Sequence, residues 1–180
     1  YVQIAVPSRG GVDSYQRFRR QVEESVGRLS ASLGTEQSVP LHFLHQRGGP
    51  REHAALYGAA DVMVVTPLRD GMNLVAKEFV AARDHNSGVL MLSQFTGAAR
   101  ELGDAVLVNP YAIDACAQAL AEALTMTREE QARHMGAMRA VVAEFNAYRW
   151  VVEILTDAAH LRVNRELRRQ TDWPAHSIPA

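Results

Sequence analysis

The fold of this chain is decided by residues 64–81, which read VVTPLRDGMNLVAKEFVA. The opening valines belong to an apolar run over 62–65 that stops before Pro67, which is typical of a short buried strand. From Leu74 onward, apolar side chains return at helical spacing, and we expect a helix over 74–83. A strand, a polar loop and a helix in this order form the repeating unit of a parallel α/β fold.

The same alternation extends in both directions along the chain. Apolar runs that predict strands occupy residues 2–6, 41–44, 62–65, 89–92 and 105–108. Stretches with helical spacing occupy residues 14–33, 51–60, 74–83, 113–124, 128–144 and 150–161. Because the strands are apolar on both faces and separated by helices, the predicted fold class is α/β: a Rossmann-like parallel sheet with helices on both faces.

Local signals also predict where elements and domains end. Asp13 is the expected N-cap of the first helix, and Gly34 is the expected residue just past its C-terminus. We expect residues 1–162 to form one domain and residues 163–180, which are basic and then contain prolines, to be a mobile surface extension. The chain starts at Tyr1, inside a predicted strand, so we expect it to be part of a longer protein.

The composition excludes several classes of function. The chain has 180 residues, of which 47% are hydrophobic and 22% are charged, as in ordinary globular domains. A formal net charge of −1 gives no field that would attract nucleic acid or an anionic membrane surface, and no apolar run is long enough to span a bilayer. The single cysteine, Cys116, cannot form an internal disulfide and is expected in the core, which suits a cytoplasmic protein.

Three loops that follow predicted strands carry candidate ligand-binding residues. They span residues 7–11, 66–73 and 93–99, and ligands of open α/β sheets bind beyond the carboxyl ends of the strands. Arg9 in the first loop has the chemistry to clamp a phosphate, but an isolated arginine is more often a surface residue. In the third loop, the small residues within 95–99 favour close packing of a helix on the sheet over ligand contact.

The second loop is the richest, because it leads directly into a helix. The free N–H groups of a helix N-terminus can hold a phosphate, and Gly71 lets the backbone approach a ligand. Asp70 and Glu78 place carboxylates near that end, where they can accept hydrogen bonds from the hydroxyls of a sugar and a ribose. The alternative is a plain loop capped by Asn73 with a solvated Glu78, and these residues by themselves do not decide between the two. The spacing of histidines and cysteines indicates no metal site.

Residues 64–81 resemble the signature of the trehalose-6-phosphate synthase family. Segments 3–9, 60–62, 92–99 and 107–110 resemble the same family in order and spacing, so the resemblance covers roughly residues 1–160. It implies the C-terminal, nucleotide-sugar-binding half of a two-domain GT-B fold. The N-terminal half of that fold, which carries the acceptor pocket, would then be missing from this chain.

The resemblance also implies a role for each residue that matches a functional position of the family. The implied residues are Asp70 (also the catalytic residue), Gly71, Met72 and Asn73 for the donor sugar, Leu74 and Val75 for the donor phosphate, Glu78 for the ribose, Gly48 for the nucleobase, and Arg9 for the acceptor phosphate. The loop over 47–51 departs from the usual family pattern. That departure leaves the choice between a uridine and a guanosine donor open.

The activity implied by the resemblance is retaining glycosyl transfer from a UDP- or GDP-linked sugar to a sugar phosphate, with formation of trehalose 6-phosphate. It implies no metal, no other cofactor and no protein nucleophile, and this chain alone is expected to be inactive without the acceptor half. An alternative is the related validoxylamine A 7′-phosphate synthase, a pseudo-glycosyltransferase that couples GDP-valienol to validamine 7-phosphate through a C–N bond. A binding module without catalysis is a more distant alternative, and the formation of a homo-oligomer stays open.

Overall fold

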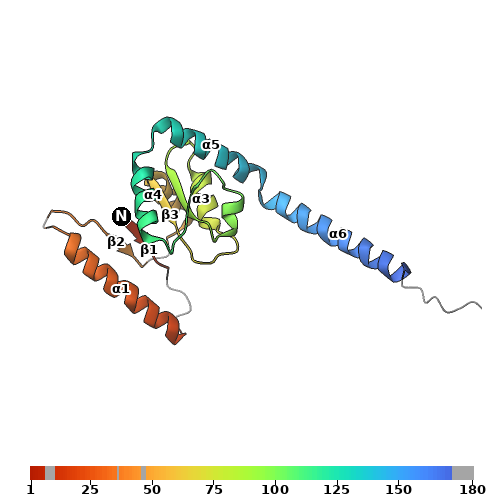
Figure 1. Ribbon diagram of the computed structural model, residues 1–180, viewed down its shortest axis with the longest axis horizontal. Coiled ribbons are helices and arrows are strands. Elements are labelled where there is room, and N and C mark those ends of the chain that lie inside the picture. The colour runs from red at the N-terminus through yellow and green to blue at the C-terminus, as the bar shows by residue number, and fades with distance from the viewer. Residues whose placement is uncertain (7–10, 36, 46–47, 172–180) are drawn as a thin grey trace, which may run out of the picture. The chain divides into compact units, whose positions relative to one another are not determined.

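The computed structural model describes residues 1–6, 11–35, 37–45 and 48–171. The chain divides into two compact units, Tyr1–His53 and Ala54–Ala180. The boundary between them falls within helix α2 (Pro50–Ala59). Each unit contains a parallel sheet, and the elements are labelled in Figure 1.

The first unit is built on one strand–helix–strand crossover. Strands β1 (Val2–Ile4) and β2 (His42–Leu44) pair in parallel, and helix α1 (Asp13–Leu33) connects them. The expected cap of this helix is wrong, because the helix already includes Asp13 and its N-cap is Val12, whose side chain makes no capping hydrogen bond. Gly34 does end α1. A Cβ at this position would lie 2.6 Å from the carbonyl oxygen of Ser30, so contact with the last helical turn favours glycine there.

The second unit holds a three-stranded parallel sheet in the order β3-β4-β5. Its strands are β3 (Val62–Val65), β4 (Val89–Ser93) and β5 (Val106–Val108). The central strand β4 is buried along its whole length, as expected for a strand that is apolar on both faces. Among the described residues, the strands are thus shared between two sheets, and both sheets are parallel, which confirms the α/β class.

Helices cover both faces of the second sheet. In Figure 1, α3 (Leu74–Ala82) and α4 (Ile113–Thr125) lie on opposite sides of the strands. Helix α5 (Arg128–Glu144) packs against α3 and β4, and a capping box between Thr127 and Glu130 fixes its start. The core of this unit includes Phe79, Leu90, Leu92, Leu102, Met135 and Met138, all with at most 2% of their surface exposed.

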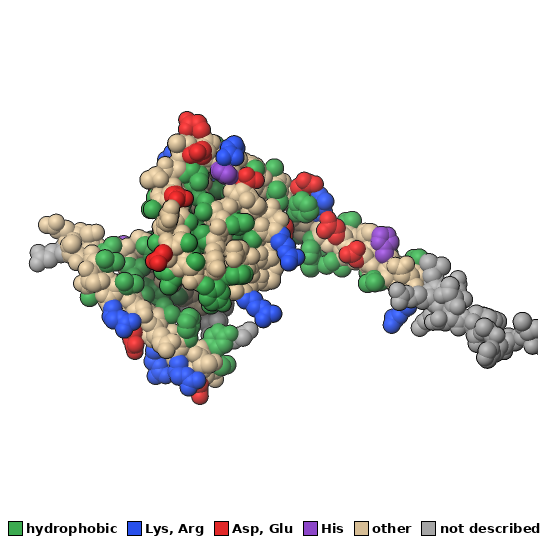
Figure 2. Space-filling view, in the orientation of Figure 1, with side chains coloured by type: hydrophobic (Ala, Val, Ile, Leu, Met, Phe, Trp, Pro, Cys, Tyr) green, Lys and Arg blue, Asp and Glu red, His purple; other side chains and the backbone are tan. Residues whose placement is uncertain are grey.

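The last described helix, α6, spans Ala147–Thr171 and corrects the expected extent of the C-terminal element. The sequence predicted a helix over 150–161 followed by a mobile extension from 163, but the helix starts earlier and continues to Thr171. The side chain of Asn146 caps it by accepting from the N–H groups of Tyr148 and Arg149. Described α6 side chains are exposed apart from the half-buried Arg149, and Figure 2 shows hydrophobic groups between charged ones along this helix.

The predicted domain limits are neither confirmed nor excluded. Helix α6 runs without a break across the expected boundary between residues 162 and 163, and residues 172–180 lie outside the described part of the chain. The assignment of residues 1–162 to one donor-binding domain stays a prediction. Within the described ranges, no helix is both long enough and apolar enough to cross a membrane.

Candidate functional site

The predicted ligand loop lies at the carboxyl end of β3, between that strand and the start of α3. It is held there by the loop that follows β4. The backbone N–H of Asp70 donates to the carbonyl of Phe95 at 3.4 Å, and the N–H of Gly97 donates to the carbonyl of Asp70 at 3.0 Å. These two bonds bring two of the sequence-predicted loops, 66–73 and 93–99, together at one edge of the sheet, where ligands of α/β folds bind.

Gly97 lies where the two loops approach each other closely. A Cβ at this position would lie 2.0 Å from the carbonyl oxygen of Gly71, far inside any van der Waals contact. The neighbouring Ala98 is buried, and Thr96 caps the short helix η1 (Gly97–Arg100). Residues 95–99 were expected to allow close packing of a helix on the sheet. The structure shows close packing at Gly97, but against the candidate ligand loop. The structure gives these small residues a positioning role that the sequence analysis missed.

The carboxylate of Asp70 is fixed within its own loop. Its Oδ1 accepts from the backbone N–H of Met72 at 3.2 Å, and its Oδ2 accepts from the side-chain amide of Asn73 at 2.8 Å. Asn73 is itself the N-cap of α3, because its Oδ1 accepts from the N–H of Ala76 at 2.8 Å. One buried asparagine thus starts the helix and orients the half-buried Asp70.

The first turn of α3 offers backbone donors to a ligand. Leu74 and Val75 are its first residues, and their N–H groups have no carbonyl acceptor one turn earlier inside the helix. Both side chains are exposed, as is that of Met72 in the preceding loop. This open helix N-terminus, with its positive dipole end, has the geometry that holds a phosphate.

Gly71 is exposed, and its glycine identity has no explanation inside the described chain. A Cβ added there would meet no atom within 4 Å. The residue also lacks the positive φ that favours glycine, which among the described glycines occurs at Gly88. Neither packing among the described residues nor backbone conformation demands a glycine at position 71, and its role in the close approach of a ligand stays a prediction.

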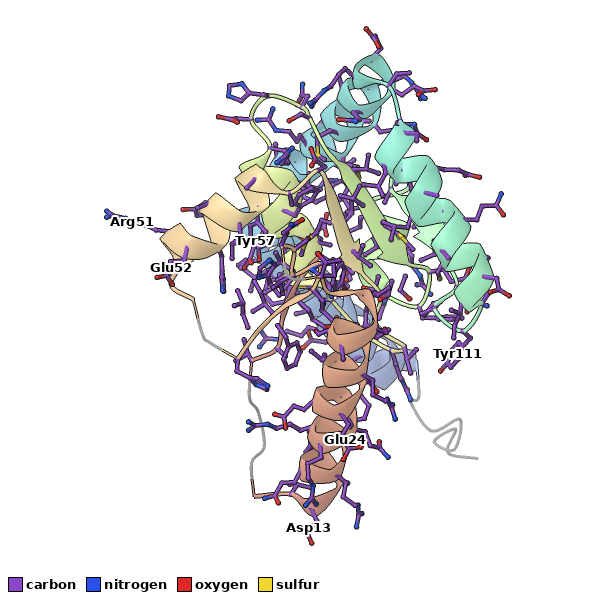
Figure 3. All side chains as sticks on the ribbon, turned by 90° about the vertical axis from the view of Figure 1, so that its left-hand side faces the viewer. Asp13, Glu24, Arg51, Glu52, Tyr57 and Tyr111 are labelled. Carbon is purple, nitrogen blue, oxygen red and sulfur yellow. The ribbon has the colours of Figure 1, made fainter. Side chains whose placement is uncertain are left out.

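Glu78 lies one turn further along α3, with an exposed side chain, and Tyr57 of helix α2 contacts it. The hydroxyl of Tyr57 donates to Oε2 of Glu78 at 3.1 Å. Tyr57, labelled in Figure 3, is buried with 8% of its surface exposed and belongs to the hydrophobic core of the second unit. Burial, followed by the hydrogen bond to Glu78, raises the pKa of Tyr57 to about 12, so its phenol stays protonated near neutral pH.

The buried Arg83 joins the end of α2, which carries Tyr57, to the end of α3. Nη1 of Arg83 donates to the carbonyls of Tyr57 and Gly58 at 2.7 and 2.6 Å, and Nε donates to the carbonyl of Ser87 at 2.6 Å. Burial of the guanidinium lowers the pKa of Arg83, the main opposing influence being the charge of Asp61. These bonds anchor the C-terminal end of α2, and with it Tyr57, to the end of α3.

The other predicted site residues lie in the first unit or outside the described ranges. Gly48 belongs to the turn that starts α2, where a Cβ would lie 2.8 Å from the His53 ring. The backbone N–H of the adjacent Gly49 donates to Oε2 of Glu52 at 2.8 Å, so the side chain of Glu52 holds this turn. Arg9 lies outside the described residues. The structure therefore brings together the predicted residues from Asp70 to Glu78 and leaves the roles of Gly48 and Arg9 as predictions.

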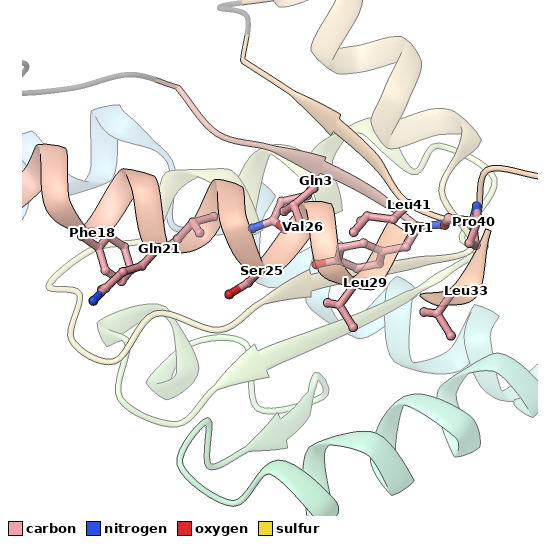
Figure 4. A pocket seen from close by; sticks show the side chains of 11 residues that line it. Tyr1, Gln3, Phe18, Gln21, Ser25, Val26, Leu29, Leu33, Pro40 and Leu41 are labelled. Atoms are coloured by element: carbon pink, nitrogen blue, oxygen red, sulfur yellow. The ribbon is translucent and has the colours of Figure 1, made fainter. Parts of the chain in front are cut away.

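A cavity of about 450 Å³ occurs in the first unit, beside helix α1 (Figure 4). Its walls are mainly apolar, with Phe18 and Leu29 from α1 and Tyr1, Pro40 and Leu41 from the strand ends. Among the described residues that line it, the polar side chains are uncharged. Of the predicted site residues that the structure describes, none lines this cavity.

The structure also describes the surroundings of Cys116 and the arrangement of potential metal ligands. Cys116 is half-buried and its thiol donates to the carbonyl of Asn109 at 3.2 Å, so it is a partly buried packing residue of α4. Among the described residues, no group of three or more histidine, cysteine, aspartate or glutamate side chains is arranged to hold a metal ion.

Comparison with known proteins gives consistent matches. The sequence profile of glycosyltransferase family 20 matches residues 1–160. The trehalose-6-phosphate synthase of Mycolicibacterium vanbaalenii is 49% identical over 155 residues, which are 86% of this chain and 31% of that protein. The one from Klebsiella pneumoniae is 44% identical over 170 residues, which are 94% of this chain and 36% of that protein. This chain thus spans about a third of the length of these curated relatives.

A solved structure of similar fold supports the same match. The α,α-trehalose-phosphate synthase (UDP-forming) from Burkholderia xenovorans, in complex with glucose-6-phosphate, superposes with a TM-score of 0.84 at 43% identity. The superposition covers 87% of this chain and 34% of that one.

Proposed function

Because the chain belongs to glycosyltransferase family 20, we propose that the full-length protein is a retaining trehalose-6-phosphate synthase. It transfers a glucosyl unit from a UDP- or GDP-linked donor to a sugar phosphate acceptor. This chain supplies the donor-binding half, and the acceptor pocket lies in the remaining length that the relatives have. The observation that carries the proposal is the open N-terminus of α3, with Asp70 oriented at its mouth and Glu78 one turn along.

The proposed roles follow the order of groups along the segment. Asp70 and its loop accept hydrogen bonds from the hydroxyls of the donor sugar. The N–H groups of Leu74 and Val75 stabilise the charge that develops on the departing diphosphate. Glu78 accepts the hydroxyls of the ribose. Donor phosphate and acceptor hydroxyl meet on one face of the sugar, so the protein contributes position and charge stabilisation without a covalent intermediate.

We propose that this reaction requires no metal, because backbone N–H groups at a helix terminus take the place of a cation beside the diphosphate. Activity should then persist after treatment with EDTA. Loss of activity with EDTA and its recovery on addition of Mg²⁺ would contradict this part of the proposal. We also propose a cytoplasmic location, because the substrates of such an enzyme are cytoplasmic metabolites.

The test measures release of nucleoside diphosphate by the full-length protein. UDP-glucose and GDP-glucose are each offered with glucose 6-phosphate, and GDP-valienol is offered with validamine 7-phosphate. We expect acceptor-dependent release from a glucose donor and an α,α-linked product. Release only in the cyclitol arm would establish the C–N coupling activity instead, and no release in any arm would overturn the enzymatic proposal.

A variant ties the activity to the site. Asp70→Asn keeps the size of the side chain but removes the charge that faces the donor, and we expect turnover to fall by at least about tenfold. Asp157→Asn, on the exposed surface of α6, is the matched control and should turn over normally. Equal activity of the two variants would remove Asp70 from the proposed mechanism.

A further inference from the structure

We propose that Tyr57 is a positioning residue for the donor ribose: its buried hydroxyl orients the carboxylate of Glu78 so that this carboxylate selects a cis-diol. The inference rests on the proposed function, and specifically on the role of Glu78 at the ribose. Tyr57 would not touch the donor itself. It acts through a contact between two helices, made by residues that are 21 positions apart in sequence.

The hydroxyl of Tyr57, which donates this hydrogen bond, is held in place independently of Glu78. The ring of Tyr57 packs edge-on against Phe79, with 6.3 Å between the ring centroids, and Phe79 is completely buried. The backbone carbonyl of Tyr57 accepts from Arg83, which fixes the helical turn that carries the ring. The position of the hydroxyl is therefore set by the core of the second unit.

The side chain of Glu78, which accepts this hydrogen bond, would otherwise be free to change rotamer. Glu78 is exposed, and a glutamate on a helix surface has several rotamers of similar energy. The hydroxyl of Tyr57 donates a hydrogen bond to the Glu78 carboxylate. The hydrogen bond to Oε2 restricts the rotation of the carboxylate, and Oε1 has lone pairs that could accept a hydroxyl of a ligand.

The chemistry of the contact suits a diol. A carboxylate is an acceptor only, and each of its oxygens can take more than one hydrogen bond. Tyr57 remains protonated at neutral pH, so it orients the carboxylate as a donor and adds no charge. A carboxylate held in one plane can receive both hydroxyls of a ribose, whereas a mobile one must be ordered when the ligand binds.

The discriminating measurement is the preference for ribose over 2′-deoxyribose. Full-length wild-type protein and the variants are titrated with UDP and 2′-deoxy-UDP, and with GDP and 2′-deoxy-GDP as the matching pair. Tyr57→Phe removes one hydroxyl and keeps the ring, so the packing against Phe79 survives. We expect this variant to bind the ribonucleotide about three- to tenfold more weakly and the deoxyribonucleotide nearly as well as wild type, which lowers the ratio between them.

Two further variants complete the test. In a Glu78→Ala background, Tyr57→Phe should have no additional effect on either affinity, because the two residues act as a pair. Tyr148→Phe, at an exposed position of α6, is the matched control and should leave the ratio unchanged.

Each outcome has a defined meaning. If Tyr57→Phe weakens both nucleotides equally, the hydroxyl has a structural role only and the inference is overturned. If it changes neither affinity, the contact does not position Glu78 and the inference is likewise overturned. If wild-type protein binds none of the four nucleotides, the proposed function falls and this inference with it, so the two failures are distinguishable.

Discussion

Replacement of Gly97 by alanine places a methyl group where the carbonyl oxygen of Gly71 now lies. The added Cβ would sit 2.0 Å from that oxygen, and ordinary contacts begin near 3.4 Å. The difference means that the two backbones must separate by roughly 1.4 Å. Gly97 does not have a positive φ, so the effect is purely steric and not conformational. The displaced atom belongs to the residue between Asp70 and Met72, at the centre of the proposed donor loop.

The size of the effect follows from that displacement. A misplacement of about 1 Å at a reacting centre can lower turnover by about 100-fold, and we expect kcat/KM of Gly97→Ala to fall by about that factor. The same strain should lower the free energy of unfolding by about 1–3 kcal/mol, as overpacking does in other proteins. The variant should therefore remain folded while losing most of its activity.

The assay compares full-length wild type, Gly97→Ala and Gly103→Ala for kcat/KM with the nucleotide-sugar donor and for urea unfolding. Gly103 is the matched control, because an added Cβ there meets no atom within 4 Å and its φ is also unstrained. We expect Gly103→Ala to be close to wild type in both measurements. The reasoning would be refuted if Gly97→Ala kept its kcat/KM within about threefold of the control.

Three further predictions use the same neighbourhood. Gly71→Ala should leave the free energy of unfolding unchanged or raise it by up to about 1 kcal/mol, because the added Cβ meets no atom within 4 Å. It should nevertheless weaken nucleotide-sugar binding measured by calorimetry, and an unchanged affinity would contradict close approach of the ligand to Gly71. Arg83→Met should lower the free energy of unfolding by about 3 kcal/mol in urea, since it leaves the carbonyls at the end of α2 unpaired, and a loss below about 1 kcal/mol would contradict this anchoring role. The pKa of Tyr57 is raised to about 12 from 10.0, so the stability it contributes is fully present below about pH 10 and is lost as the pH rises towards 12. Between about pH 9 and about pH 11, wild type should lose about 1 kcal/mol more stability than Tyr57→Phe, and parallel losses would show that Tyr57 titrates normally.

Elements with a local signal were predicted well from sequence. The limits of β3 (Val62–Val65) and α5 (Arg128–Glu144) match the predicted ranges, because alternation, turn residues and capping boxes are encoded by neighbouring residues. The predicted extent of α6 was wrong. Its cap is Asn146, four residues before the predicted start, and the basic stretch after residue 162 contains good helix formers.

The candidate site also has a part that could be predicted from sequence and a part that could not. The loop and helix start from Asp70 to Val75 were predictable, because a strand end followed by a helix N-terminus is a contiguous pattern. The contacts of Gly97 with Gly71 and of Tyr57 with Glu78 were not, because each joins elements whose register is decided only when the second unit packs. A lone sequence also gives no reason to prefer Tyr57 over any other buried aromatic residue.

The two non-local contacts hold different ends of the same segment. Gly97, from the loop after β4, sets the backbone beside Asp70 and therefore acts on the part proposed to face the donor sugar. Tyr57, from α2, sets the side chain of Glu78 and therefore acts on the part proposed to face the ribose. Between them, the N–H groups at the start of α3 depend on the helix itself and on its cap. Because these supports come from separate elements, a change in one can alter recognition of a single part of the donor while the rest of the segment keeps its geometry.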